Sequence, residues 1–255
     1  MTPLILALIA ASVFITSVIS GVFGMAGGLI LMTVLLNLMS LQAAMAVHAG
    51  IQMVANGWRC FLWRGHIVWH VLPFYIAGMA AGLIAISFIK YVPDKAVALI
   101  VMGSLPLLAM LAGKTLTLSI TNKTQTFCAA ACLTFIQMTA GVVGPLLDLL
   151  YNNAPLTRQQ IVSTKAFTQT AMHLVRLVYF GALVPLLTGT SQWPEGLKPE
   201  FMLLFMAASI AGTSAAAMLL HRLSDHGFKK ASRGLIAVIS LYCLGQGFYM
   251  IFTGN

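Results

Sequence analysis

Two segments of the chain carry polar residues at matching positions. HAGIQMVANGWR (His48–Arg59) contains His48, Gln52, Asn56 and Arg59, and KAFTQTAMHLVR (Lys165–Arg176) contains Lys165, Gln169, His173 and Arg176 at the same intervals. On an α-helix, positions i, i+4, i+8 and i+11 lie within an arc of about 80° and extend over about 16 Å. Each segment therefore predicts a helix with one polar stripe, in which neutral hydrogen-bond donors stand beside cationic groups that attract an anion.

A cluster of glycines interrupts the apolar run before the first stripe. ISGVFGMAGGLILM (Ile19–Met32) contains Gly21, Gly24, Gly27 and Gly28. Glycine permits unusual backbone angles and close approach of another group, and the first amides of a short helix after a break attract an anion. We therefore take Gly24, Gly27 and Gly28 as candidate anion-binding residues. The alternative is close helix packing through small residues.

The second half of the chain has a related break with a different sequence. GVFG (Gly21–Gly24) returns as GVVG (Gly141–Gly144), followed by Pro145, which interrupts a helix, and by Asp148. Asp148 is an acid within an apolar run, and it is interpreted either as the cap of a short helix or as a proton site that couples transport. His173 is a second candidate for coupling, because histidine changes charge between about pH 5 and 8.

The composition places these segments in a membrane. The 255 residues are 60% hydrophobic and 7% charged, whereas soluble domains have about 25% charged residues. We therefore predict a single polytopic membrane protein with no separate soluble domain. A charged side chain at the middle of a bilayer costs about 2.5–3.5 kcal/mol, so the stripes are expected to face protein or water.

The stripes have two interpretations. As a polar pathway, they supply candidate anion-binding residues at His48, Gln52, Asn56, Lys165, Gln169 and His173, with Arg59 and Arg176 further along the pathway. As structural residues, they make hydrogen bonds between helices, and the two arginines snorkel to the two membrane surfaces.

The fold is predicted to be all-α with two homologous halves. Apolar runs long enough to cross about 30 Å of hydrocarbon lie near residues 3–20, 43–63, 70–90, 96–112, 125–141, 159–187, 201–220 and 234–252, and shorter runs cover 29–39 and 145–151. The paired stripes and glycine motifs indicate a duplication, as in many secondary transporters. We predict a first repeat at 1–112, a linker at 113–124 and a second repeat at 125–255, each repeat with about four full spans and one short, broken or re-entrant helix.

Positive charge predicts the orientation of the halves. HRLSDHGFKKASR (His221–Arg233) is rich in Lys and Arg and is predicted to be a cytoplasmic loop. If the halves are inverted, the segment is joined inside by Arg64, Lys114, Lys123 and Arg158, while Lys90, Lys95 and Lys198 lie outside. Parallel halves give a smaller bias. We therefore predict inverted repeats with both termini outside.

Three stretches carry a resemblance to a known family. They are SGVFGMAGG after the first apolar run, AVHAGIQMVANGWRCFLWRGHI after it, and QIVSTKAFTQTAMHLVRLVYFG in the second half. Over nearly its whole length the chain resembles the TauE/SafE sulfite exporter family, with its 4-toluene sulfonate uptake-like transporters. The resemblance implies a multi-pass transporter of the bacterial inner membrane that exports sulfite, sulfoacetate or related organic anions. The second half departs from the family, because many members repeat the glycine cluster where this chain has GPLLD (Gly144–Asp148).

Other functional classes lack the residues that they need. The chain has five acids in total and neither an HExxH nor a GxSxG motif, so we expect no enzyme activity, no metal site and no cofactor. The expected partners are a small anion and the lipid bilayer, and nucleic acid is excluded because the basic residues fall at membrane edges. The sequence leaves the oligomeric state open. The alternatives to an exporter are an anion channel and a metal-ion permease.

Overall fold

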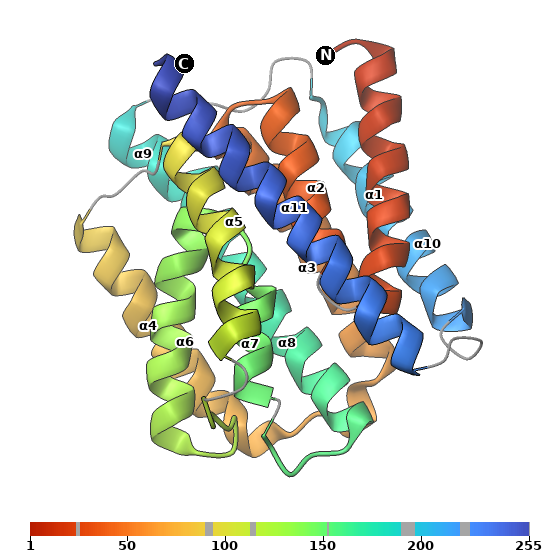
Figure 1. Cartoon of the computed structure of the whole chain (residues 1–255), viewed down its shortest axis with the longest axis vertical. Helices are drawn as coiled ribbons and strands as arrows, with labels where there is room; N and C mark the ends of the chain where they lie inside the picture. Colours follow the sequence, from red (N-terminus) through yellow and green to blue (C-terminus); the bar gives the residue numbers. More distant parts are fainter. Residues whose placement is uncertain are drawn as a thin grey trace.

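The computed structural model is built from helices (Figure 1). It describes residues 1–23, 26–89, 94–112, 116–151, 153–189, 197–219 and 225–254. The longer helices are α1 (Pro3–Phe23), α3 (Leu41–Leu62), α4 (Leu72–Ile89), α5 (Lys95–Ala112), α6 (Lys123–Ala140), α8 (Arg158–Val178), α10 (Pro199–Leu219) and α11 (Asp225–Thr253). The shorter ones are α2 (Ala26–Leu38), α7 (Gly144–Tyr151), α9 (Val184–Thr188) and the single turns η1 (Arg64–His66), η2 (Trp69–Val71) and η3 (Tyr179–Leu183). Every regular element within these ranges is helical, which confirms the all-α class.

Five of the described helical segments are apolar and long enough to cross a membrane. They cover residues 3–22, 69–89, 95–112, 199–218 and 233–253. Helices α3, α6 and α8 have similar lengths but contain more polar residues. The short helices α2 and α7 lie where the two short apolar runs were predicted. The eight full spans predicted from the sequence therefore correspond to these five apolar segments and to the three more polar helices α3, α6 and α8.

Local signals set where the helices of the two stripes begin. Ser40 caps α3 by accepting a hydrogen bond from the backbone N–H of Ala43, with an N–O distance of 3.4 Å. Thr157 and Gln160 form a capping box at the start of α8. Helix α6 ends at Gly141, whose φ of 76° lies in the left-handed region that glycine adopts easily. These signals fix the heights of the stripes on α3 and α8 and the position of the second break.

The structure refines one predicted run and corrects another boundary. The run predicted at 159–187 is helical throughout, from Arg158 to Thr188, with a π-helical turn at Tyr179–Leu183 between α8 and α9. The segment His221–Arg233 is not a loop throughout, because α11 begins at Asp225.

Helices from the two halves of the chain pack against one another. Helix α1 packs along α10, α4 along α6, α3 along α8 and α5 along α11. The α4–α6 pair approaches closely, since a Cβ on Gly78 would lie 2.1 Å from the carbonyl oxygen of Phe127. In Figure 1 the N- and C-termini lie at the same end of the bundle. The two helices that carry the polar stripes are thus direct neighbours.

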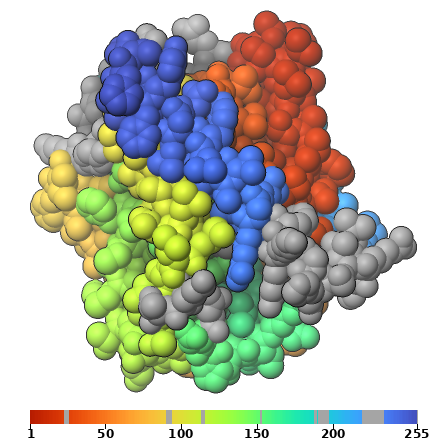
Figure 2. All heavy atoms as spheres, in the orientation of Figure 1, coloured from red at the N-terminus to blue at the C-terminus, as the bar shows by residue number. Residues whose placement is uncertain are grey.

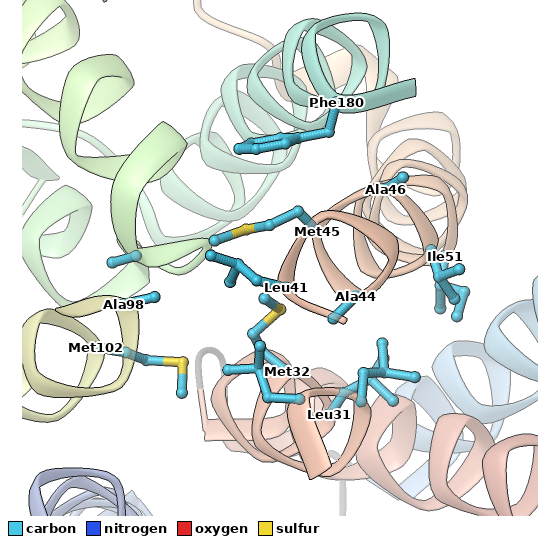
Figure 3. Packing of buried hydrophobic residues seen from close by; sticks show 14 of the residues in the cluster. Leu31, Met32, Leu41, Ala44, Met45, Ala46, Ile51, Ala98, Met102 and Phe180 are labelled. Atoms are coloured by element: carbon cyan, nitrogen blue, oxygen red, sulfur yellow. The ribbon is translucent and has the colours of Figure 1, made fainter. Parts of the chain in front are cut away.

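The largest apolar core surrounds α2 and α3. Met45 extends from α3 and lies next to Phe180 (Figure 3). Leu31 and Met32 project from α2, which lies on the side of α3 opposite Phe180 (Figure 3). All four side chains are buried. On the outer face, α11 lies over α5 (Figure 2). This packing holds the start of α2 beside the polar stripe of α3.

Candidate functional site

A polar cavity lies between α3 and α8, where the two broken helices approach them. Its cavity volume is about 30 Å³, so in this state it is a small space in comparison with the about 300–1,000 Å³ of sites for drug-sized ligands. The cavity is lined by Ser20, Gly28, His48, Gln52, Asn56, Gln137, Gly141, Val142, Val143, Gly144, Gln169 and His173. The structure thus brings together six residues singled out as candidates from the sequence: Gly28, His48, Gln52, Asn56, Gln169 and His173.

The glycines at the start of α2 have different surroundings. A Cβ on Gly28 would lie in the cavity, 3.4 Å from Nε2 of Gln52. A Cβ on Gly27 would instead lie 1.9 Å from the carbonyl oxygen of Thr16 on α1. Gly27 therefore allows α1 and α2 to pack closely, as in the alternative interpretation, and it does not line the cavity. Gly24 lies outside the described residues.

Arg176 is buried behind the cavity wall. Its exposed fraction is 0%, so the interpretation that it snorkels to a membrane surface is wrong. One terminal guanidinium nitrogen donates to the carbonyl oxygen of Gly141, and the other donates to Nδ1 of His48. The guanidinium thus ties the break before α7 to α3. Among the described residues no carboxylate forms an ion pair with it, so its positive charge is not neutralised by these residues.

These contacts fix the tautomer of His48. A guanidinium has only donors, so Nδ1 of His48 accepts the hydrogen bond from Arg176. Nε2 of His48 lies 2.9 Å from the carbonyl oxygen of Gly28, to which it must donate. His48 is therefore a neutral imidazole with its proton on Nε2. A second proton on Nδ1 would break the bond from Arg176.

His173 is less constrained than His48. Its Nδ1 lies 3.3 Å from the side-chain nitrogen of Gln137, which donates to it, so Nε2 carries the proton. The rings of His48 and His173 are 5.8 Å apart in an edge-to-face arrangement. If the Gln137 amide turned over, its oxygen would face Nδ1 and accept a bond from it.

Three donors of the cavity have no partner within the described part of the chain. They are the side-chain nitrogens of Gln52 and Gln169 and Nε2 of His173. The Gln52 oxygen accepts a weak bond from Nδ2 of Asn56 at 3.4 Å, which leaves its nitrogen available. Neutral N–H donors bind the lone pairs of an oxyanion without forming an ion pair. These three donors are thus the groups of the cavity that remain available for a hydrogen-bond acceptor.

Asn56 and Arg59 form the end of the first stripe. Nδ2 of Asn56 donates to the carbonyl oxygen of Gln52 at 2.9 Å, and Arg59 donates to Oδ1 of Asn56 at 3.4 Å. Arg59 is half-buried and does not contribute to the lining. The side chain of Asn56 is thus oriented by its own helix, and Arg59 lies next to the cavity wall.

Lys165 and Asp148 lie beside the cavity instead of in it. The Lys165 ammonium on α8 forms an ion pair with the Asp148 carboxylate on α7. Lys165 precedes the lining residue Gln169 by one helical turn, and Asp148 follows the lining residue Gly144 by one turn. Asp148 lies inside α7 and not before its first residue, so the interpretation as a helix cap is wrong.

Comparison with known proteins identifies the class of the chain. The family model described as sulfite exporter TauE/SafE matches residues 8–243. The chain belongs to the TauE/SafE sulfite exporter family. This confirms the resemblance found in the sequence, and together with the apolar helices it makes the chain a multi-pass membrane transporter. No curated protein and no solved structure was found to match the chain.

The cavity of this TauE/SafE protein also contains residues that were not selected from the sequence. Ser20 and Gln137 each lie within about one turn before a glycine of the two breaks, and both line the cavity. A polar side chain at the end of an apolar helix, directly before such a break, is the signal that could have identified them. Val142 and Val143 lie in the non-helical link between α6 and α7, and no property of their side chains marks them.

Proposed function

We propose that this TauE/SafE transporter exports small sulfur-containing or organic oxyanions, such as sulfite or sulfoacetate, across the bacterial inner membrane. The anion binds in the cavity between α3 and α8. The observation that carries this proposal is a cavity of neutral donors backed by the buried guanidinium of Arg176, with which no carboxylate of the described residues forms an ion pair.

Arg176 favours an anion over a cation at this site. A buried charge is costly unless another charge or strong hydrogen bonds offset the cost. Its bonds to His48 and to the Gly141 carbonyl offset part of that cost. An anion in the neighbouring cavity supplies the missing negative charge, whereas a cation adds to the repulsion. Among the described residues, no three His, Cys, Asp or Glu side chains form a group that could hold a metal ion, which favours the exporter over the metal-ion permease.

We propose that the halves are inverted repeats that tilt against one another around the cavity. Exchanging α1 with α6, α3 with α8, α4 with α10 and α5 with α11 turns the α1–α10 pair into the α6–α4 pair and leaves the other two pairs as they are. One polar wall comes from each half, and both broken helices begin at the cavity. In transporters of this kind, a relative tilt of the repeats opens the site to one side and then to the other.

Export of an anion can run on the membrane potential alone. The outward movement of one negative charge across an inside-negative membrane is favourable by about 2.3 kcal/mol per 100 mV. A proton is therefore needed only for uptake or for steeper accumulation.

Transport assays in proteoliposomes test this function. Purified protein is assayed with sulfite, sulfoacetate, sulfolactate and carboxylate anions under a set membrane potential. We expect saturable sulfite or sulfonate flux that is lost in Gln52→Leu and kept in Lys198→Gln, whose side chain is exposed outside the cavity. Flux that rises without saturation indicates a channel, and flux of divalent cations in place of anions indicates a permease. Either result contradicts the proposal.

A further inference from the structure

The Asp148–Lys165 ion pair is the most unusual feature next to the cavity. We infer that Asp148 is an exchangeable internal anion: its carboxylate occupies Lys165 in the empty transporter, and the substrate anion displaces it on the way to the cavity. The inference rests on the proposed function and assigns a role to a pair that does not touch the cavity itself.

The pair lies one helical turn from the cavity, on the side of α8 toward Arg158. Lys165 stands between Arg158, where α8 begins, and Gln169, which lines the cavity. Arg158 belongs to the end of the molecule that the charge distribution predicts to be cytoplasmic. An anion that approaches from that end therefore meets Lys165 about one turn, or roughly 5 Å, before it reaches Gln169.

Comparison of the two halves shows what Asp148 replaces. The alignment of GVFG with GVVG sets Gly28 against Asp148, and the alignment of the stripes sets His48 against Lys165. In the first half, Nε2 of His48 donates to the carbonyl oxygen of Gly28, and both residues line the cavity. In the second half, the corresponding contact is the ion pair.

The first half thus has a neutral hydrogen bond, between His48 and Gly28, at the edge of the cavity. At the corresponding place the second half has the Lys165 ammonium paired with the Asp148 carboxylate. A carboxylate offers the same type of oxygen acceptors as the proposed substrates. The Asp148 carboxylate and a substrate anion can therefore compete for the Lys165 ammonium.

The ion pair is not sealed inside the protein, whereas a contact next to it is buried. The side chains of Lys165 and Asp148 are 13% and 28% exposed. One turn further on, the hydroxyl groups of Tyr151 and Thr168 are bonded at 3.2 Å and both residues are buried. This contact keeps α7 attached to α8 while the ion pair opens.

The test compares the KM for sulfite of variants that remove either member of the pair. We expect Asp148→Asn to lower KM by about fivefold, because Lys165 no longer has a competing carboxylate. We expect Lys165→Gln to raise KM by about fivefold or more, and Lys165→Arg to keep it within about twofold. The double variant Asp148→Asn/Lys165→Gln should behave as Lys165→Gln does. Glu200→Gln and Lys198→Gln, both exposed residues at the start of α10, are the matched controls and should leave KM unchanged.

A purely structural ion pair gives a different pattern. Both single variants would then change KM in the same direction, and the double variant would recover the wild-type value. Either a change of KM in the same direction or recovery in the double variant overturns the inference. Sulfite transport by the wild type would still support the proposed function. If Lys165→Arg raises KM as much as Lys165→Gln, the anion does not use the charge, and the inference is also wrong. A wild-type protein that does not carry sulfite overturns both.

Discussion

Gly28 and Gly27 are adjacent in sequence, but the structure predicts different effects of substitution at the two positions. Substitution of Gly28 should impair anion binding, and substitution of Gly27 should lower the stability of the fold. The change to be made is a single methyl group, in Gly28→Ala or in Gly27→Ala. On Gly28 the new Cβ lies 3.4 Å from Nε2 and 3.8 Å from Cδ of Gln52. These are ordinary van der Waals distances, so the fold accommodates the methyl group.

The methyl group on Gly28 does, however, occupy the cavity next to a free donor. An anion there loses access to the Gln52 nitrogen, and a hydrogen bond to a charged group contributes about 1.5–3 kcal/mol. We therefore expect Gly28→Ala to raise the KM for sulfite by about 10- to 150-fold. The melting temperature of the detergent-solubilised protein should stay within about 2 °C of the wild-type value.

Gly27→Ala is the matched control at the neighbouring position. Its Cβ would lie 1.9 Å from the carbonyl oxygen of Thr16 and 2.7 Å from the backbone nitrogen of Ser20, so α1 and α2 must move apart. Overpacking of this kind costs about 1–3 kcal/mol, which lowers the melting temperature by roughly 4–8 °C for a loss of ~2 kcal/mol.

Transport and thermal stability measured on the same preparations separate the two effects. If Gly28→Ala transports sulfite with the wild-type KM, the start of α2 is not part of the anion site. If Gly27→Ala is as stable as the wild type, the close approach of α1 and α2 is not as the structure places it.

Three further predictions concern the residues behind and around the cavity. Arg176→Met should abolish sulfite transport, because it removes the positive charge behind the cavity and the bonds to His48 and the Gly141 carbonyl. Arg64→Met, at an exposed position, is the control, and equal sulfite fluxes in the two variants would contradict the role of Arg176. His173→Gln should keep potential-driven sulfite flux but change the dependence of that flux on pH between about 5.5 and 8. A wild-type flux that does not vary over this range would show that His173 does not couple a proton to transport. His48→Gln should lose most of the flux at every pH, because His48 is held neutral between Arg176 and Gly28. A flux equal to that of the wild type would show that the hydrogen bonds of His48 do not shape the cavity.

Much of the helical framework can be predicted from the sequence, because apolar runs and polar residues at helical spacing indicate where the helices lie. Apolar runs and glycine or proline breaks place both short helices, and α2 and α7 begin within a few residues of the predicted runs. The stripes on α3 and α8 are predictable because a charged or amide side chain cannot face lipid and must point toward protein or water. The start of α11 was not predictable in this way, since a polar segment rich in Lys and Arg is compatible with a loop and with a helix outside the membrane.

The candidate site is predictable only in part because its members differ in what fixes them. His48, Gln52, Gln169 and His173 follow from their spacing on two helices. The difference between Gly27 and Gly28 depends on which face of α2 touches α1, and no local pattern determines that contact. The ion pair between Asp148 and Lys165 likewise arises from the packing of α7 on α8.

Diffraction from crystals grown with selenite tests most directly whether the cavity is the anion site. Selenite has the shape and charge of sulfite, and data collected at the selenium absorption edge locate it without ambiguity. We predict one strong anomalous peak in the cavity, within about 3–4 Å of the side-chain nitrogens of Gln52 and Gln169. The peak should weaken when sulfite is added in excess and should be absent in Gly28→Ala. A peak elsewhere in the molecule, or an empty cavity at selenite concentrations that support transport, would contradict the proposed site.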